Sequence, residues 1–218
     1  MFTQHKASRR NKLLQDFSVV VLIMGFVVTP AVAQTGGWYG GLGFGQTKIN
    51  DFNSICSDVL SFLPAGSTCS SDDKDTGFKV FAGNQFNKNG AIEFGYIDLG
   101  KGSISLSGPG VGGTATWEAT GFNLALVGSL PVNEAFGVLG RIGIFAWNLD
   151  FNVSGLGGSA SESASGTDLT YGVGVKYDFN KTTGMRFEWE KFKDVGDENT
   201  TGQGDIDLLS LSLVFRFQ

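Results

Sequence analysis

The sequence predicts an all-β protein, an eight-stranded antiparallel transmembrane β-barrel, from three observations. Residues 208–217 read LLSLSLVFRF, in which an apolar face alternates with a more polar face at the period of a strand. The same alternation recurs in seven earlier segments. The connections between the segments are alternately long and short, as in barrels that cross a membrane with short turns on one side and long loops on the other.

The eight expected strands cover residues 38–49, 77–86, 91–99, 117–130, 135–150, 167–179, 184–192 and 208–217. Long polar or Gly/Ser-rich loops are expected at 51–75, 100–116, 153–166 and 194–204, and short turns at 87–90, 131–134 and 180–183. No segment of helical period is expected after the first thirty-odd residues. A soluble sandwich is the alternative, but it would need another layer to cover the apolar faces of eight strands.

Residues 1–33 have the pattern of a cleaved export signal. A basic start is followed by an apolar run and by Ala31-Val32-Ala33, the small-x-small pattern before a signal-peptidase site. A transmembrane helix is the alternative, but Pro30 follows about twelve apolar residues, where about twenty are needed to cross a bilayer. We therefore expect a signal peptide at 1–33 and one barrel domain at 34–218.

The composition of the remaining chain narrows the function classes. Residues 1–33 hold four of the 16 Lys and Arg and one of the 21 Asp and Glu, so residues 34–218 carry a net charge of −8. This balance does not favour a nucleic-acid partner. In an exported chain, Cys56 and Cys69 are expected to form a disulfide.

Charged side chains on the polar faces of the strands are the candidate functional residues. An eight-stranded barrel is only wide enough for interior side chains to meet, so these charges should form a paired interior plug. Lys176 opposite Glu188 is a plausible cross-hairpin pair, and Asp178 can help to balance the excess of basic groups. Inward glycines would leave room for long side chains. The predicted plug residues are Lys79, Glu93, Arg141, Lys176, Arg186, Glu188, Glu190 and Arg216.

After the export signal that ends Ala31-Val32-Ala33, five motifs follow one another along the chain: WYGGLGFG from Trp38, GFKVFAGNQFNKNGAIEFGYIDLG from Gly77, GVGVKYDFN from Gly172, MRFEWEKF from Met185 and the closing LLSLSLVFRF. In this order they resemble the OmpA-like family of small outer-membrane β-barrels. Two departures are Asn84, which stands where the family usually has an aromatic residue, and Gln218 after the last aromatic residue. The peptidoglycan-binding domain that follows the barrel in longer relatives is not expected here.

The resemblance implies a location in the bacterial outer membrane and contact with outer-membrane lipid and lipopolysaccharide. It also implies insertion by the outer-membrane assembly machinery, which would read the aromatic-ended last strand. The expected signal residues are Leu209, Leu211, Leu213, Phe215 and Phe217. The long loops would face a host or surface ligand.

Catalysis, metals and cofactors are not expected. His5 is the only histidine, and it lies in the predicted signal peptide, so residues 34–218 cannot use a Ser-His or Asp-His mechanism. Glu188 and Glu190 could act as acid and base, but they read as plug charges. The acidic loop residues near Asp72 and Asp194 lack EF-hand spacing. The sequence favours a structural or surface-interaction role, with a small-solute pore as the alternative and a lipid-acting enzyme as a weaker one.

Overall fold

The computed structural model describes residues 36–50, 52–198 and 200–217. The predicted signal peptide and Gln218 lie outside the described residues. The elements in chain order are β1 (Trp38–Ile49), α2 (Phe52–Leu60), β2 (Thr68–Asp72), β3 (Lys74–Gln85), β4 (Gly90–Gly108), β5 (Val111–Pro131), β6 (Phe136–Gly155), β7 (Gly158–Asp178), β8 (Thr183–Asp197) and β9 (Gly202–Arg216).

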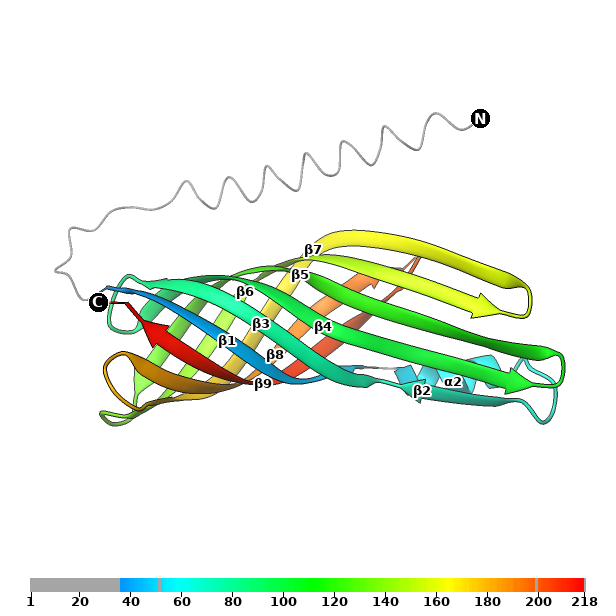
Figure 1. Cartoon of the computed structure of the whole chain (residues 1–218), viewed down its shortest axis with the longest axis horizontal. Coiled ribbons are helices and arrows are strands. Elements are labelled where there is room, and N and C mark those ends of the chain that lie inside the picture. Colours follow the sequence, from blue (N-terminus) through cyan, green and yellow to red (C-terminus); the bar gives the residue numbers. More distant parts are fainter. Residues whose placement is uncertain (1–35, 51, 199, 218) are drawn as a thin grey trace, which may run out of the picture. The chain divides into compact units, whose positions relative to one another are not determined.

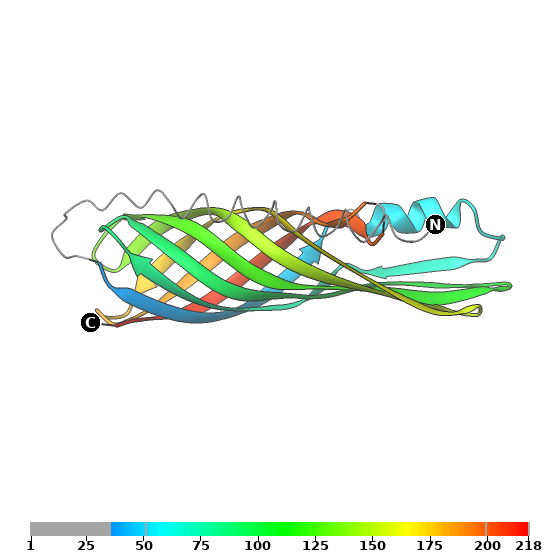
Figure 2. The same cartoon turned by 90° about the horizontal axis from the view of Figure 1, so that it is seen from above.

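Eight of the strands form a closed antiparallel ring, which confirms the predicted barrel (Figure 1). The ring runs β1-β3-β4-β5-β6-β7-β8-β9, and β9 pairs with β1 from Tyr39↔Arg216 to Ile49↔Ile206. The short turns lie at the end of the barrel where β1 starts and β9 finishes, here called the terminal end. The long hairpins lie at the opposite end, here called the hairpin end (Figure 2).

The closing strand β9 shows how the alternation is used. Leu209, Leu211 and Leu213 point outward and are 38–45% exposed, whereas Ser210 and Ser212 point inward and are 1% exposed. Large apolar side chains are exposed in the same way on every strand of the ring. The barrel thus presents to its surroundings a surface that water would not favour but lipid would.

Two segments predicted as loops are strands along most of their length, and a third, 194–204, is partly strand because β8 runs to Asp197 and β9 begins at Gly202, so those expectations were wrong. β4 and β5 stay paired past an irregularity between Asp98 and Lys101 as far as Gly108↔Val111, and β6 and β7 as far as Gly155↔Gly158. Both faces of these hairpins are largely rich in Ser, Thr and Gly. An apolar stripe is unnecessary where both faces meet water, so the periodic signal on which the prediction relied is missing.

The first long connection is also more ordered than predicted. It contains α2, a helix that the sequence pattern did not predict, and a ninth strand, β2, which pairs with the hairpin part of β4 from Thr68↔Ser107 to Asp72↔Ser103. With only nine residues, α2 is too short to give a clear helical period. No helix among the described residues is long and apolar enough to cross a bilayer.

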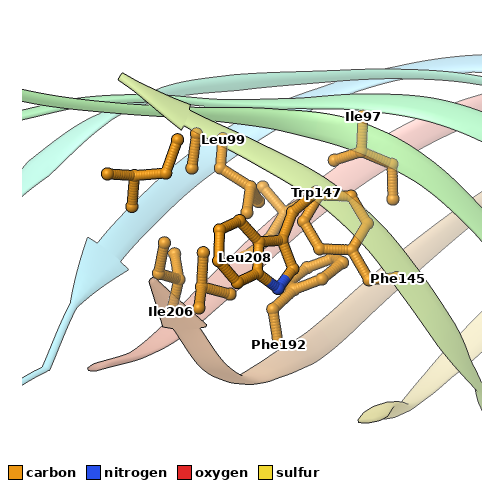
Figure 3. Close-up of a cluster of buried hydrophobic side chains, with 10 residues drawn as sticks. Ile97, Leu99, Phe145, Trp147, Phe192, Ile206 and Leu208 are labelled. Carbon is orange, nitrogen blue, oxygen red and sulfur yellow. The ribbon is translucent and has the colours of Figure 1, made fainter. Parts of the chain in front are cut away.

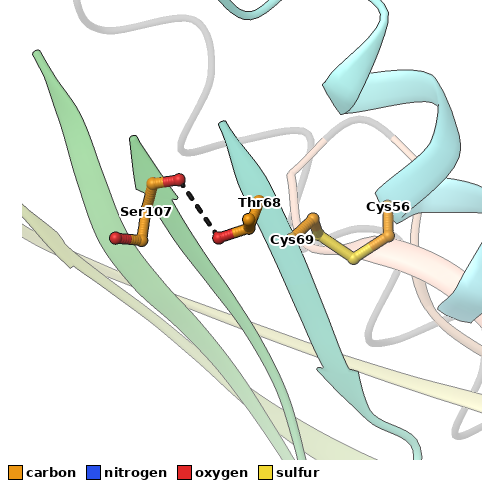
Figure 4. Close-up of a disulfide and its surroundings, with 4 residues drawn as sticks. All are labelled: Cys56, Thr68, Cys69 and Ser107. Atoms are coloured by element: carbon orange, nitrogen blue, oxygen red, sulfur yellow. Dashed lines mark hydrogen bonds between the residues drawn. A yellow bond between two sulfur atoms is a disulfide. The ribbon is translucent and has the colours of Figure 1, made fainter. Parts of the chain in front are cut away.

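The disulfide between Cys56 and Cys69 joins α2 to β2, with Cα atoms 5.6 Å apart (Figure 4). On the other side of β2, the Thr68 hydroxyl donates a hydrogen bond to the Ser107 carbonyl oxygen. Cys56 itself packs on Ile104 of β4. The disulfide therefore fixes α2 against the wall formed by the β4–β5 hairpin.

Replacing both cysteines with serine should loosen the first connection without unfolding the barrel. The closed loop spans only thirteen residues and lies outside the strand ring, so the lost constraint acts locally. We expect chymotrypsin to cut the double variant after Phe62, which lies inside this loop and is 87% exposed, at least tenfold faster than the wild type. The fraction of protein that migrates as folded barrel in unheated samples on a denaturing gel should not change. Equal cleavage rates for the variant and the wild type would contradict this account of the disulfide.

Candidate functional site: the closed lumen

Six charged side chains meet inside the barrel, and we call them the charge cluster. They come from four strands: Lys79 on β3, Glu93 on β4, Arg141 on β6, and Arg186, Glu188 and Glu190 on β8. Each is 8% exposed or less. The alternation of the strands points all six inward, and the antiparallel ring brings them to one level.

Lys79 and Arg141 share the two carboxylates of β8. Lys79 Nζ lies 2.9 Å from Glu188 Oε2 and 2.5 Å from Glu190 Oε2. Arg141 Nη1 lies 3.3 Å from Glu188 Oε1 and 2.8 Å from Glu190 Oε1. Each of these carboxylates therefore faces two cations, which offsets much of the cost of removing it from water.

Glu93 completes the cluster on the opposite wall. Its Oε1 accepts hydrogen bonds from Arg186 at 2.5 Å and from the Tyr39 hydroxyl at 2.7 Å, and its Oε2 lies 3.6 Å from Arg141. The Arg186 guanidinium also lies over the Tyr39 ring, 5.0 Å from its centre. Three cations and three carboxylates thus form one continuous network across the lumen.

Two apolar layers enclose the charge cluster. Towards the hairpin end, Ile97, Leu99, Phe145, Trp147, Phe192, Ile206 and Leu208 pack together (Figure 3). Towards the terminal end lies a smaller group that includes Tyr39, Phe81 and Val214. The strand alternation predicts a polar lumen, and both apolar layers differ from this prediction. Their signal was present, because Ile97, Leu99 and Leu208 lie on the inward side of the alternation.

The remaining predicted plug residues, Lys176 and Arg216, lie outside the charge cluster. Both pair with Asp178, Lys176 at 3.5 Å from its Oδ2 and Arg216 through a short contact with its Oδ1. The expected pair of Lys176 with Glu188 was wrong. In the observed register Lys176 is opposite Arg186, and Gly174 is opposite Glu188, so a two-residue offset separates the expected partners.

Glycines on β7 make room for the charge cluster. A Cβ atom added to Gly174 would lie 2.8 Å from Glu188 Cγ, and one added to Gly172 would lie 3.1 Å from Glu190 Cγ. The same atoms would approach the carbonyl oxygens of Phe187 and Trp189 to 2.5 Å. The side chains of Glu188 and Glu190 therefore lie directly against the glycine backbone of β7. Any larger residue at Gly172 or Gly174 would displace them.

The geometry gives little support to other chemistry in the lumen. Glu188 and Glu190, the candidate acid and base, are both held by Lys79 and Arg141. Among the described residues, no three His, Cys, Asp or Glu side chains are grouped as metal ligands. The arrangement is suited to filling and closing the lumen.

Comparison with known proteins agrees with this geometry. The model of the OmpA-like transmembrane domain family matches residues 33–218. The chain belongs to this family. It is an OmpA-like outer-membrane β-barrel, and its location is the outer membrane.

Curated relatives of this OmpA-like barrel are longer than the chain. Outer membrane protein A of Yersinia pseudotuberculosis is 30% identical over 209 residues, which cover 92% of the chain and 54% of the relative. Outer membrane protein A of Shigella flexneri is 27% identical over 204 residues, with the same coverage. The chain thus spans about half the length of the curated relatives it matches.

Solved structures share the fold of this OmpA-like barrel. Ail, the attachment invasion locus protein of Yersinia pestis, superposes with a TM-score of 0.52 at 16% identity, covering 84% of the chain and all of Ail. The outer membrane protein OprG of Pseudomonas aeruginosa gives 0.51 at 13% identity, covering 83% of the chain and 97% of OprG. At these identities the likeness concerns the fold alone.

Proposed function

We propose that this barrel is a sealed outer-membrane protein with a structural or surface-interaction role, and that its hairpin end faces outward. The observation that carries the proposal is the charge cluster between two apolar layers. An ion entering the lumen would have to cross both apolar layers and displace side chains that already satisfy one another. The cluster thus acts as a plug and not as the lining of a channel.

The surface role is supported by the hairpin end. The β4–β5 and β6–β7 hairpins extend beyond the closed ring, and β2 widens the sheet they form (Figures 1 and 2). A host or surface ligand would meet these exposed hairpins first. Shortening each hairpin in turn while the ring stays unchanged, followed by a binding screen on intact cells, would identify the one that carries an interaction.

Export and assembly belong to the same proposal. A cleaved signal at 1–33 would deliver the chain, and the assembly machinery would recognise β9 together with the residue that follows it, since the outward residues from Leu209 end in the aromatic Phe215 and Phe217. Outer-membrane lipid and lipopolysaccharide would then cover the outward apolar surface. We propose no catalytic activity for the lumen, since its candidate acid and base, Glu188 and Glu190, are both paired with Lys79 and Arg141.

Planar-bilayer recordings test the sealed lumen against the alternative of a small-solute pore. The wild-type barrel should show no stable conductance. Arg186→Ala should produce stable openings, because it removes the partner of Glu93 Oε1 and part of the side-chain volume in the plug. Arg216→Ala is the matched control, since Arg216 points to the lumen outside the charge cluster, and it should stay closed.

Two results would contradict the proposal. Stable wild-type conductance with uniform step size would favour the pore. Equal conductance of Arg186→Ala and Arg216→Ala would show that the charge cluster is not what closes the lumen. Each protein should first be shown to migrate faster unheated than boiled on a denaturing gel, so that recordings come from folded barrels.

A further inference from the structure

A cavity of about 200 Å³ lies at the hairpin end, beyond the apolar layer that covers the charge cluster. Six strands of the ring contribute to its apolar wall, through Ile49, Leu99, Trp117, Ala119, Leu149, Val195 and Ile206. The other lining groups are Ile55 of α2, glycine backbone and the uncharged Asn50, Thr201 and Gln203. No ionised side chain lines the cavity, so its ligand must be uncharged and mainly apolar.

The wall of the cavity is firmly packed. Trp117 Nε1 donates a 2.8 Å hydrogen bond to the Thr201 carbonyl oxygen, and the Trp117 ring packs on Phe151 with 4.8 Å between ring centres. Leu99, Ala119 and Leu149 belong to the same buried layer as Phe145 and Trp147. The side chains around the cavity are therefore held by neighbours and cannot easily collapse into it.

Helix α2 covers part of the cavity. Ile55 lines it, and the next residue, Cys56, is tied to Cys69 of β2 and packed on Ile104 of β4. The first long connection thus contributes an apolar cover whose position is fixed covalently. Covering the cavity is a structural role for α2 and the Cys56–Cys69 disulfide, neither of which belongs to the closed ring.

We propose that this cavity binds a small uncharged apolar molecule, of the size of a single aromatic ring or a short alkyl chain. Size sets this class: a 150 Å³ cavity lined by Leu, Ile and Phe in another protein stays dry and binds benzene or xenon. The present cavity is of similar size, and its apolar wall is packed around Trp117, Leu99 and Leu149, so little reorganisation of this wall is needed to accept such a ligand. The site is independent of whether the lumen conducts.

Methyl NMR of the full barrel in dimyristoylphosphatidylcholine nanodiscs tests the proposal, with toluene as the probe. Methyl signals of Leu99, Leu149, Val195 and Ile206 should shift and saturate as toluene is added. Those of Leu126 and Ile142, which face outward at 56% exposure, should shift only in proportion to the toluene dissolved in the lipid. Proportional shifts in both sets would overturn the proposal.

Two variants locate the bound molecule. Ala119→Leu should fill the cavity and weaken saturable binding at least tenfold, whereas Ala82→Leu, the same change on the outward face of β3, should not affect it. Ile55→Asp places a carboxylate in the cover, outside the ring, and should also weaken binding at least fivefold. If Ala119→Leu does not fold, the dissociation constant of Ile55→Asp for toluene is the test of the proposal. An unchanged dissociation constant in the folded variants would overturn the proposal.

Discussion

Glu188→Gln should lower the free energy of unfolding of the barrel by about 3–5 kcal/mol, the usual cost of breaking a buried ion pair by removing one partner. Glu188 is fully buried and faces both Lys79 and Arg141. Glutamine keeps the size of the side chain but removes its charge. Three cations would then share two carboxylates in a layer that water does not reach.

Urea unfolding in lipid vesicles, followed by the fraction that migrates as folded barrel in unheated samples, measures this loss. Glu118→Gln is the matched control, because the Glu118 carboxylate pairs with Lys101 on the exposed hairpin. Its effect should stay within about 1 kcal/mol. The combined change Glu188→Gln and Lys79→Met restores equal numbers of charges and should recover much of the loss. Equal effects of Glu188→Gln and Glu118→Gln would refute the role given to the charge cluster.

Leu211→Arg should destabilise the inserted barrel by about 2–4 kcal/mol, the range for a basic side chain on a lipid-facing strand near the middle of the bilayer. Leu211 points outward from β9 and is paired with Phe44 and Phe187, next to the level of the charge cluster. The guanidinium group would have to enter hydrocarbon or bend away from it.

Val153→Arg is the matched control for lipid exposure. Val153 is also exposed, at 37%, but lies on the β6–β7 hairpin beyond the closed ring. Its replacement should change stability by less than about 0.5 kcal/mol. Vesicle unfolding and the yield of heat-modifiable barrel should separate the two variants. Similar losses for both would mean that Leu211 does not face lipid.

The strand alternation predicted the ring, because one apolar face per strand leaves a local trace in the sequence. It also predicted the inward direction of all six residues of the charge cluster. Register left no such trace: Lys176 lies opposite Arg186 because of how β7 and β8 pair, and no single-strand pattern contains that offset.

The features that sequence reasoning missed have different physical causes. The hairpins beyond the ring are polar on both faces, and α2 is short and fixed by a disulfide, so neither depends on a periodic apolar face. The interior apolar layer around Trp147 and Phe192 was not predicted, because the inward faces of the strands were expected to be polar along the whole lumen. An inward Ile97 beside an outward Tyr96 was the available clue.

The balance of the charge cluster has a consequence for its response to an electric field. Moving one elementary charge across a membrane with a potential difference of 100 mV changes its energy by about 2.3 kcal/mol. Lys79, Arg141 and Arg186 are matched by Glu93, Glu188 and Glu190, so moving the cluster as a unit transports no net charge. A transmembrane voltage should therefore exert no net force on the charge cluster of the wild-type barrel, whereas Glu188→Gln leaves the cluster with one net positive charge on which the field can act.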